Sequence, residues 1–408
     1  MLFKDIIGQQ ATKQQLCEMV ENNRLSHALL FLGKEGSGAL PLALAFAQYV
    51  SLLPNPSGGE GAKPQPISLF GEVIEQAVIT IPSTPAEADA FMEKNPAYSK
   101  ASKYIHPDIH FSYPVIPKKS GDKPKSTDYI TEWREFIAQY PYGNAFDWLQ
   151  FIGAENKQGN ITAEECNDII HKLNLKSFES EYKILVMWMP EYLGKEGNKL
   201  LKLIEEPPAN TLFILVAENE EQILPTILSR CQLVKIPLPE TAEIEEALIN
   251  RAGATEDVAS QTAAIAEGNY REALQLLQHS EEDWIGLLSD WLKFIIRSML
   301  QDQVKWVDEI SKLGREKQKQ LLLYFNHLLE QGIRLRVMGD GLAISTKEKD
   351  FAQRINKITS VSQQQVIIEE LDKATYYIER NANAKMLFHA LTIKMYHIIQ
   401  DKALFLTD

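Results

Sequence analysis

The sequence predicts an α/β domain with a parallel sheet, followed by a part of the chain that is entirely helical. Three observations carry this prediction. Short apolar runs at 27–32, 183–188 and 211–216 alternate with helical segments, which is typical of a parallel sheet covered on both faces. A glycine-rich loop at 33–38 follows the first run directly and leads into a helix. Beyond Pro239, every periodic segment has helical spacing.

The elements of the α/β part can be placed in order along the chain. The helix after the glycine loop begins near Ala39, and Pro41 is compatible with it because the first helical turn does not need the missing amide. The other expected elements are strands within 77–82, 104–115, 183–188, 211–216 and 233–236, and helices over 162–175 and 194–206, the last ended by two prolines.

An aromatic-rich stretch follows a polar, lysine-rich loop at 116–128. Aromatic rings of this density could stack on single-stranded bases. They come with Glu132, Glu135 and Asp147, however, so the favoured interpretation is an amphipathic insert that packs on the domain or binds protein. The aromatic residues are Tyr129, Trp133, Phe136, Tyr140, Tyr142, Phe146, Trp148 and Phe151.

The chain beyond Pro239 divides into a short and a long helical region. Residues 241–280 read as a small helical unit, and at least four longer amphipathic helices are expected from Asp283 onward. Asn383 is placed to cap the last of them. Three of the later helices are expected near 316–338, 362–380 and 384–400.

These patterns predict three domains. The first is the α/β domain over 1–238, with a variable insert at about 113–160. A small helical domain over 239–281 follows, and a C-terminal helical domain covers 282–408.

The bulk composition restricts the function. Apolar residues make up 45% of the 408 and charged residues 24%, the balance of a globular chain with ample core material. The formal net charge is -13, whereas proteins that grip phosphate backbones usually carry a basic surface. A role on DNA would therefore be exerted through partners.

Cysteine usage and the N-terminal sequence predict a cytoplasmic protein without metal. Cys17, Cys166 and Cys231 are too far apart for a paired metal knuckle, and an odd number argues against a secreted disulfide scaffold. The first residues lack the layout of a signal peptide. No run approaches the ~18 apolar residues of a membrane span, so no membrane association is expected.

The glycine loop has the register of a phosphate-binding loop but lacks its chemistry. The pattern G-x-x-x-x-G-K-[ST] is met by Gly33 and Gly38, with Gly36 between them. Ala39 and Leu40 stand where a lysine should contact the β- and γ-phosphates and a hydroxyl should bind Mg²⁺. Alanine and leucine can do neither, so no nucleotide cofactor is expected.

The acidic motif that hydrolysis needs is missing as well. A phosphate-loop NTPase places an acidic pair at the end of a second apolar strand. Here the strand 184–187 is followed by Trp188 and Met189, and Glu191 lies beyond them. Glu35 adds a negative charge to the loop itself. We therefore expect no intrinsic ATP hydrolysis.

Several segments together resemble the clamp-loader branch of the AAA+ proteins. The pairing of Leu-Ile-Glu-Glu-Pro-Pro, ending at Pro208, with Ser-Arg-Cys at 229–231 is the most specific of them. The resemblance is clear over about 1–50, 104–112, 161–236 and 262–276, and residues 113–160 have no counterpart in it. The segments are 3–9, 24–28, 197–208, 224–231 and 268–273.

Within that family, the segments 106–110, 161–165 and 175–178 resemble the ATPase-inactive branch. The resemblance implies a degenerate AAA+ domain over 1–238, a lid domain over 239–281 and a C-terminal collar domain. The family commonly carries a four-cysteine zinc module after the first helix. Residues 51–105 contain no cysteine, so zinc is not expected.

The resemblance implies a role for two arginines. The arginine of Ser-Arg-Cys, Arg230, would project toward ATP bound on a neighbouring subunit as an arginine finger, a guanidinium that stabilises charge on the γ-phosphate. A structural ion pair with an acidic helix is the alternative interpretation. Arg271 matches the sensor-2 position, which contacts ATP in active subunits, and we expect it to form a structural ion pair here.

The implied function is that of a non-catalytic component of the DNA polymerase III holoenzyme that helps to load the sliding clamp at primed DNA. Its partners would be the ATPase subunits of the gamma/tau type and the delta subunit. Two alternatives remain open: an active gamma/tau-type ATPase, and an adaptor that binds single-stranded DNA through the lysine-rich 117–125 loop and the aromatic insert.

Overall fold

The structure is a computed structural model that describes residues 1–53, 81–119, 121–154, 158–278, 284–339, 346–379 and 382–401. The chain forms two compact units, Met1–Gln275 and Leu276–Asp408. Most of the run predicted as a strand at 77–82 lies outside the described residues. This division into two units does not test the predicted domain boundaries at 238/239 and 281/282, which stay predictions.

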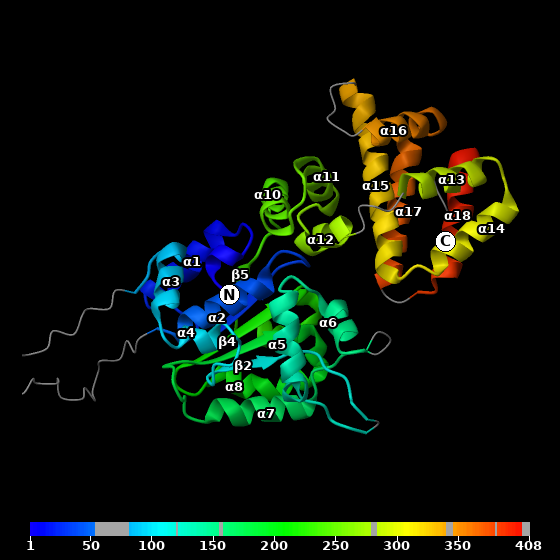
Figure 1. Cartoon of the computed structure of the whole chain (residues 1–408). Coiled ribbons are helices and arrows are strands. Elements are labelled where there is room, and N and C mark those ends of the chain that lie inside the picture. Colours follow the sequence, from blue (N-terminus) through cyan, green and yellow to red (C-terminus); the bar gives the residue numbers. More distant parts are fainter. Residues whose placement is uncertain are drawn as a thin grey trace, which may run out of the picture. The chain divides into compact units, whose positions relative to one another are not determined.

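A five-stranded parallel sheet forms the centre of the first unit (Figure 1). The strand order is β2-β3-β4-β1-β5, so β1 lies between β4 and β5. Because every strand runs the same way, all their carboxyl ends meet at one edge of the sheet. The strands are β1 (Ala28–Leu32), β2 (Ile109–Ser112), β3 (Lys183–Trp188), β4 (Thr211–Ala217) and β5 (Gln232–Lys235).

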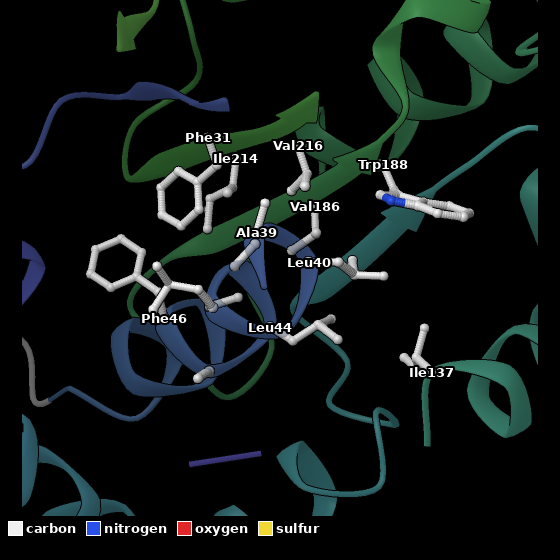
Figure 2. Close-up of a cluster of buried hydrophobic side chains, with 14 of the residues drawn as sticks. Phe31, Ala39, Leu40, Leu44, Phe46, Ile137, Val186, Trp188, Ile214 and Val216 are labelled. Carbon is white, nitrogen blue, oxygen red and sulfur yellow. The ribbon is translucent and has the colours of Figure 1, made fainter. Parts of the chain in front are cut away.

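Helices cover both faces of the sheet, because alternate side chains of each strand point to opposite faces. Leu29 and Phe31 of β1 pack into a core with helix α2 (Ala39–Ser51). Figure 2 shows this cluster, in which Ala39 and Phe46 of α2 lie near Phe31 and Ile214 of the sheet. Helices α1 (Gln10–Glu21) and α3 (Pro85–Lys94) belong to the same core, preceded by the 3-10 turn η1 (Phe3–Asp5); α4 (Tyr98–Ala101) follows α3.

The opposite face packs Ala28 and Leu30 of β1 against helix α7 (Ala163–Asn174) and the segments that follow β3. The helix predicted over 194–206 is instead a 3-10 stretch with a kink at Gly194, where φ is 49° and ψ is -132°, and a short α-helix. These segments are η3 (Pro190–Leu200), α8 (Leu201–Glu205), η4 (Glu220–Gln222) and α9 (Pro225–Leu228).

The aromatic insert packs inward, as the favoured interpretation expects. Trp133 lies at the centre of a ring cluster, stacked on Tyr113 at 4.1 Å and in contact with Trp148 at 5.3 Å and Trp188 at 5.2 Å between ring centroids. Trp133, Phe136 and Trp148 are fully buried, so these rings have no face free for a base. The insert comprises η2 (Ser126–Tyr129), α5 (Ile130–Gln139) and α6 (Ala145–Phe151).

Three further helices, α10 (Thr241–Ala252), α11 (Glu256–Ala266) and α12 (Tyr270–Gln278), follow the sheet. The first unit includes α10, α11 and most of α12. Arg251 of α10 donates hydrogen bonds to the carbonyls of Lys4 and Asp5, the latter at 2.5 Å, which ties α10 to the N-terminal segment.

The second unit is all-helical, which confirms the predicted C-terminal architecture. Its core contains Trp291 and Trp306, stacked at 4.4 Å, and Trp291 donates a 3.0 Å hydrogen bond to Thr392. Asn383 caps the last helix through Met386, as predicted. The helices are α13 (Trp284–Ile296), α14 (Leu300–Ser311), α15 (Arg315–Met338), α16 (Thr346–Ile358), α17 (Val361–Glu379) and α18 (Ala384–Gln400). Among the described residues, no helix is long and apolar enough to span a membrane.

Candidate functional site

The glycine loop joins β1 to α2 at the carboxyl edge of the sheet, where nucleotide-binding α/β domains hold phosphate. Gly36 and Gly38 have φ angles of +75° and +88°, a conformation that favours glycine. Other parts of the chain crowd both positions. A Cβ at Gly36 would lie 2.0 Å from Oδ1 of Asn269, and one at Gly38 would lie 3.2 Å from the Tyr142 ring. The loop glycines therefore make room for protein atoms.

Ala39 and Leu40 occupy the lysine and hydroxyl positions of the motif and are both buried. Their side chains lie in the core between α2 and the sheet (Figure 2). Trp188, at the expected place of the first carboxylate, packs its ring in the same core. The positions that carry catalysis in an NTPase serve hydrophobic packing in this chain.

Tyr142, from the segment between α5 and α6, fills the space beside the loop. Its hydroxyl accepts a 2.9 Å hydrogen bond from the Ile7 amide, and its ring packs edge-on against Tyr270 at 4.9 Å. The cavity that remains along the loop, bounded also by Trp188 and Met189, has a volume of about 30 Å³. Ligand pockets measure about 300–1,000 Å³. This cavity is too small for a nucleotide, whereas a second pocket of about 540 Å³ also borders Gly33 and Lys34.

Arg271 lies near the start of α12, only 4% exposed, and it is bound by two carboxylates. Its Nε and Nη2 donate to Asp147 of α6 at 2.5 and 2.6 Å, and its Nη1 donates to Glu35 of the glycine loop at 2.9 Å. Asn144 and Asn269 donate to the same Glu35 carboxylate at 2.9 and 3.3 Å. Asp147 and Glu35 thus provide the negative charge that a bound phosphate would provide to an arginine at the sensor-2 position.

Glu191, the nearest carboxylate beyond β3, has a structural partner. Its Oε1 accepts hydrogen bonds from the amides of Glu218 and Asn219 at 2.7 and 2.9 Å, which ties η3 to the end of β4. Burial raises the pKa of this carboxyl group. Glu191 fastens the loop after β4 and lies outside the lining of the cavity beside the glycine loop.

Arg230 lies at the opposite edge of the sheet from the glycine loop. It precedes β5, in which Gln232 is opposite Leu29 and Lys235 is opposite Leu32 of β1. Gly33 follows Leu32, so six residue steps along the strand direction separate Arg230 from Gly33, or about 20 Å. Arg230 therefore cannot reach the glycine loop of its own chain.

The Arg230 side chain is 33% exposed and is held by three contacts. Its Nη1 donates to the Thr226 carbonyl of α9 at 2.6 Å and to Ser229 Oγ at 3.2 Å. Its Nη2 forms an ion pair with Glu205, the last residue of α8. Exposed ion pairs contribute only about 0–1 kcal/mol, so a stronger anion can compete for this guanidinium. Burial raises the pKa of neighbouring Cys231 to about 11, which keeps it an unreactive thiol.

Asp108, in the segment that resembles the inactive branch, is a buried structural carboxylate. It accepts hydrogen bonds from the amides of Phe178, Glu179 and Ser180 at 2.6–2.7 Å. Nearby His106 accepts from the Asp108 amide at 3.2 Å. Within the described ranges, no three His, Cys, Asp or Glu side chains are grouped to hold a metal ion.

Sequence reasoning missed two residues of this region, Tyr142 and Asp147 as the partner of Arg271. The ion pair of Arg230 with Glu205 of α8 is the contact that the alternative interpretation of Arg230 expected. Asp147 and Arg271 are 124 residues apart, and no local pattern links them. A signal existed for Asp147 alone, since an acidic residue among buried aromatic rings needs a partner.

Comparison with known proteins shows similarity to subunits of DNA polymerase III. The family model described as "DNA polymerase III, delta subunit" matches residues 86–240. The DNA polymerase III subunit delta' of Bacillus subtilis (strain 168) is 24% identical over 269 residues, covering 65% of this chain and 58% of that protein. The subunit gamma of Buchnera aphidicola subsp. Acyrthosiphon pisum is 26% identical over 203 residues, covering 44% and 55%.

The chain thus spans a little more than half the length of these relatives. A solved DNA polymerase III gamma subunit-related protein from Thermotoga maritima aligns over 96% of this chain and 99% of that one, with 15% identity and a TM-score of 0.38. The family model and these relatives all carry names of DNA polymerase III subunits, and this chain is similar to them over part of its length.

Proposed function

We propose that this chain is a non-catalytic, delta-prime-type subunit of a clamp loader, which scaffolds the complex and supplies Arg230 to ATP on a neighbouring ATPase subunit. The observation that carries the proposal is the contrast between the two edges of the sheet. The glycine loop is filled by Tyr142 and fixed by Glu35, whereas Arg230 lies half-exposed at the other edge.

The occupied loop supports the non-catalytic role. Phosphoryl transfer needs a lysine on the phosphates and oxygen ligands for Mg²⁺, and Ala39, Leu40, Trp188 and Met189 provide neither. The Arg271 ion pairs join α12 to the loop without a nucleotide. This contact of α12 with the loop therefore does not depend on a bound nucleotide, which suits a scaffold.

The opposite location of Arg230 supports action in trans. In a head-to-tail arrangement, one surface of a subunit meets a different surface of the next. The edge that carries Arg230 would then face the nucleotide edge of an ATPase subunit. A guanidinium placed there stabilises the charge that develops on the γ-phosphate and accelerates hydrolysis by about 10³–10⁵-fold.

The partners follow from this role. They are ATPase subunits of the gamma/tau type and the delta subunit, with the sliding clamp and primed DNA contacted through the complex in the bacterial cytoplasm. Residues 282–408 would form the collar that joins the subunits. The net charge of -13 agrees with DNA contact through partners.

The test is the ATPase rate of the reconstituted cognate loader, stimulated by primed DNA and clamp. Arg230→Ala should lower this rate by about 10³-fold while the complex still assembles in gel filtration. Arg230→Lys should recover little, since an ammonium lacks the planar fork of donors. Arg354→Ala removes an exposed, ion-paired arginine of α16 and should leave the rate unchanged. An unchanged rate in Arg230→Ala would leave the chain as a scaffold alone.

A further inference from the structure

We propose that Glu205 is a positioning residue for Arg230, and that its carboxylate holds the guanidinium in the orientation that meets a neighbour's nucleotide. The inference rests on the proposed role of Arg230 as an arginine finger. In this inference, Glu205 affects ATP hydrolysis only through its contact with Arg230.

The place of Glu205 in its helix supports a role beyond helix stability. Glu205 is the last residue of α8, and Glu206 and two prolines follow it. A carboxylate at the carboxyl end of a helix lies at the negative end of the helix dipole, which disfavours it there. The contact with Arg230 gives this carboxylate a cation and makes its position favourable.

The guanidinium is held from two sides and keeps free donors. Glu205 binds Nη2 from α8, while Thr226 and Ser229 bind Nη1 from the end of α9. A guanidinium has five N–H donors; three contacts are made, and two donors are left without a partner within the described part of the chain. Those two donors are available to an incoming anion.

Restraint of this kind matters for rate. An exposed arginine without partners samples many rotamers, and only those that place the guanidinium at the γ-phosphate stabilise the transition state. Removing Glu205 leaves the two Nη1 contacts with α9 but frees the Nη2 side. The opposite interpretation, in which Glu205 withholds Arg230 from the phosphate, predicts a faster reaction when Glu205 is removed.

The experiment uses the reconstituted loader and measures kcat and KM for ATP with primed DNA and clamp. Glu205→Ala should lower kcat about two- to fivefold, the range of an exposed ion pair, and leave KM unchanged. Glu205→Gln retains an acceptor for Nη2 and should recover part of the loss. Glu206→Ala removes the same charge one residue later and should have no effect, which makes it the matched control.

A second set of variants separates this inference from the proposed function. In an Arg230→Ala background, Glu205→Ala should cause no further loss. If the loss persists there, Glu205 acts by another route, and if Glu205→Ala alone raises kcat, Glu205 withholds the arginine; either result overturns the inference. If Arg230→Ala itself leaves the rate unchanged, the finger is absent and the positioning role is refuted with it.

Discussion

Arg271 is a buried cation whose counter-ions come from the chain itself. A guanidinium that is 4% exposed cannot be left without partners, because an uncompensated buried charge is strongly destabilising. In an ATP-binding relative of this fold, a phosphate could satisfy such an arginine in the bound state only. Here Asp147 and Glu35 satisfy it permanently, so the closed contact between α12 and the loop needs no ligand.

Removing Asp147 should therefore destabilise the first unit. Asp147→Ala deletes two of the hydrogen bonds to Arg271 and should lower the free energy of unfolding by about 3 kcal/mol, measured by urea denaturation of the isolated chain. Glu93→Ala, which removes an exposed partner of Lys4, should cost less than about 1 kcal/mol. A loss in Asp147→Ala as small as that of the control would mean that the remaining contacts of Arg271, including the one with Glu35, are sufficient for it.

His110 on β2 gives the first unit an acid sensitivity. Burial, with a smaller contribution from Lys172, lowers the pKa of His110 from its ordinary 6.5 to about 4. Between these values the unfolded chain binds a proton that the folded chain does not, so stability falls as the pH drops from 6.5 toward 4.

His110→Asn should consequently lose less stability than the wild type between pH 7 and pH 4.5. Urea denaturation at several pH values in that range measures the difference between the two proteins. His171→Asn changes an exposed histidine of α7 and should follow the wild-type curve. Parallel curves for wild type and His110→Asn would show that His110 titrates normally in the folded chain.

At the scale of elements, the strand, glycine loop and helix of a nucleotide-binding domain are retained while their side chains serve packing. All of α2 is buried, so Ala39 and Leu40 extend a continuous core. The insert contributes as well: α5 and α6 bury their rings in the same core as α2, and the turn between them places Tyr142 beside the loop. The loop is thus occupied by an element inserted before β3.

Two short helices hold Arg230 in position at the opposite edge of the sheet. Helix α8 ends at Glu205 and α9 ends just before Ser229, and Arg230 bridges them. Each helix is too short to be stable alone, so packing of Leu203, Ile204 and Ile227 on the sheet fixes their ends. The precision of the Arg230 position depends on that packing.

At the scale of the whole molecule, the two units have separate cores. The first is built around the sheet, and the second around the stacked pair Trp291 and Trp306 with Phe325 and Phe388. The chain therefore combines a unit that carries the two arginines with a helical unit that folds on its own core.

Trp291→Ala should destabilise the second unit selectively. Removing a buried tryptophan costs about 3–5 kcal/mol, and hydrogen exchange measured by mass spectrometry should accelerate in α13–α18 while β3 and β4 stay protected. Trp133→Ala in the first unit should give the reverse pattern. Accelerated exchange in both units from one substitution would show that they unfold together.

The fold class and the lack of phosphate-binding side chains in the glycine loop could be predicted from the sequence alone. Apolar runs, the glycine loop and helical spacing are local patterns, so the strand at 183–188, the helix after Gly38 and the C-terminal helices could be placed, and the structure confirms them. The absence of a lysine at Ala39 and of a hydroxyl at Leu40 is a statement about residue identity, which needs no coordinates.

The partners of Arg271 and the side chain that packs beside the glycine loop could be identified only once the packing of the elements was known. Glu35 and Arg271 are 236 residues apart, and neither neighbourhood contains a pattern that points to the other. The same holds for Tyr142 beside Gly38. Such contacts depend on how the helices and strands pack against one another. Packing brings together side chains that are far apart in the sequence, and no repeating pattern in the sequence marks them as neighbours.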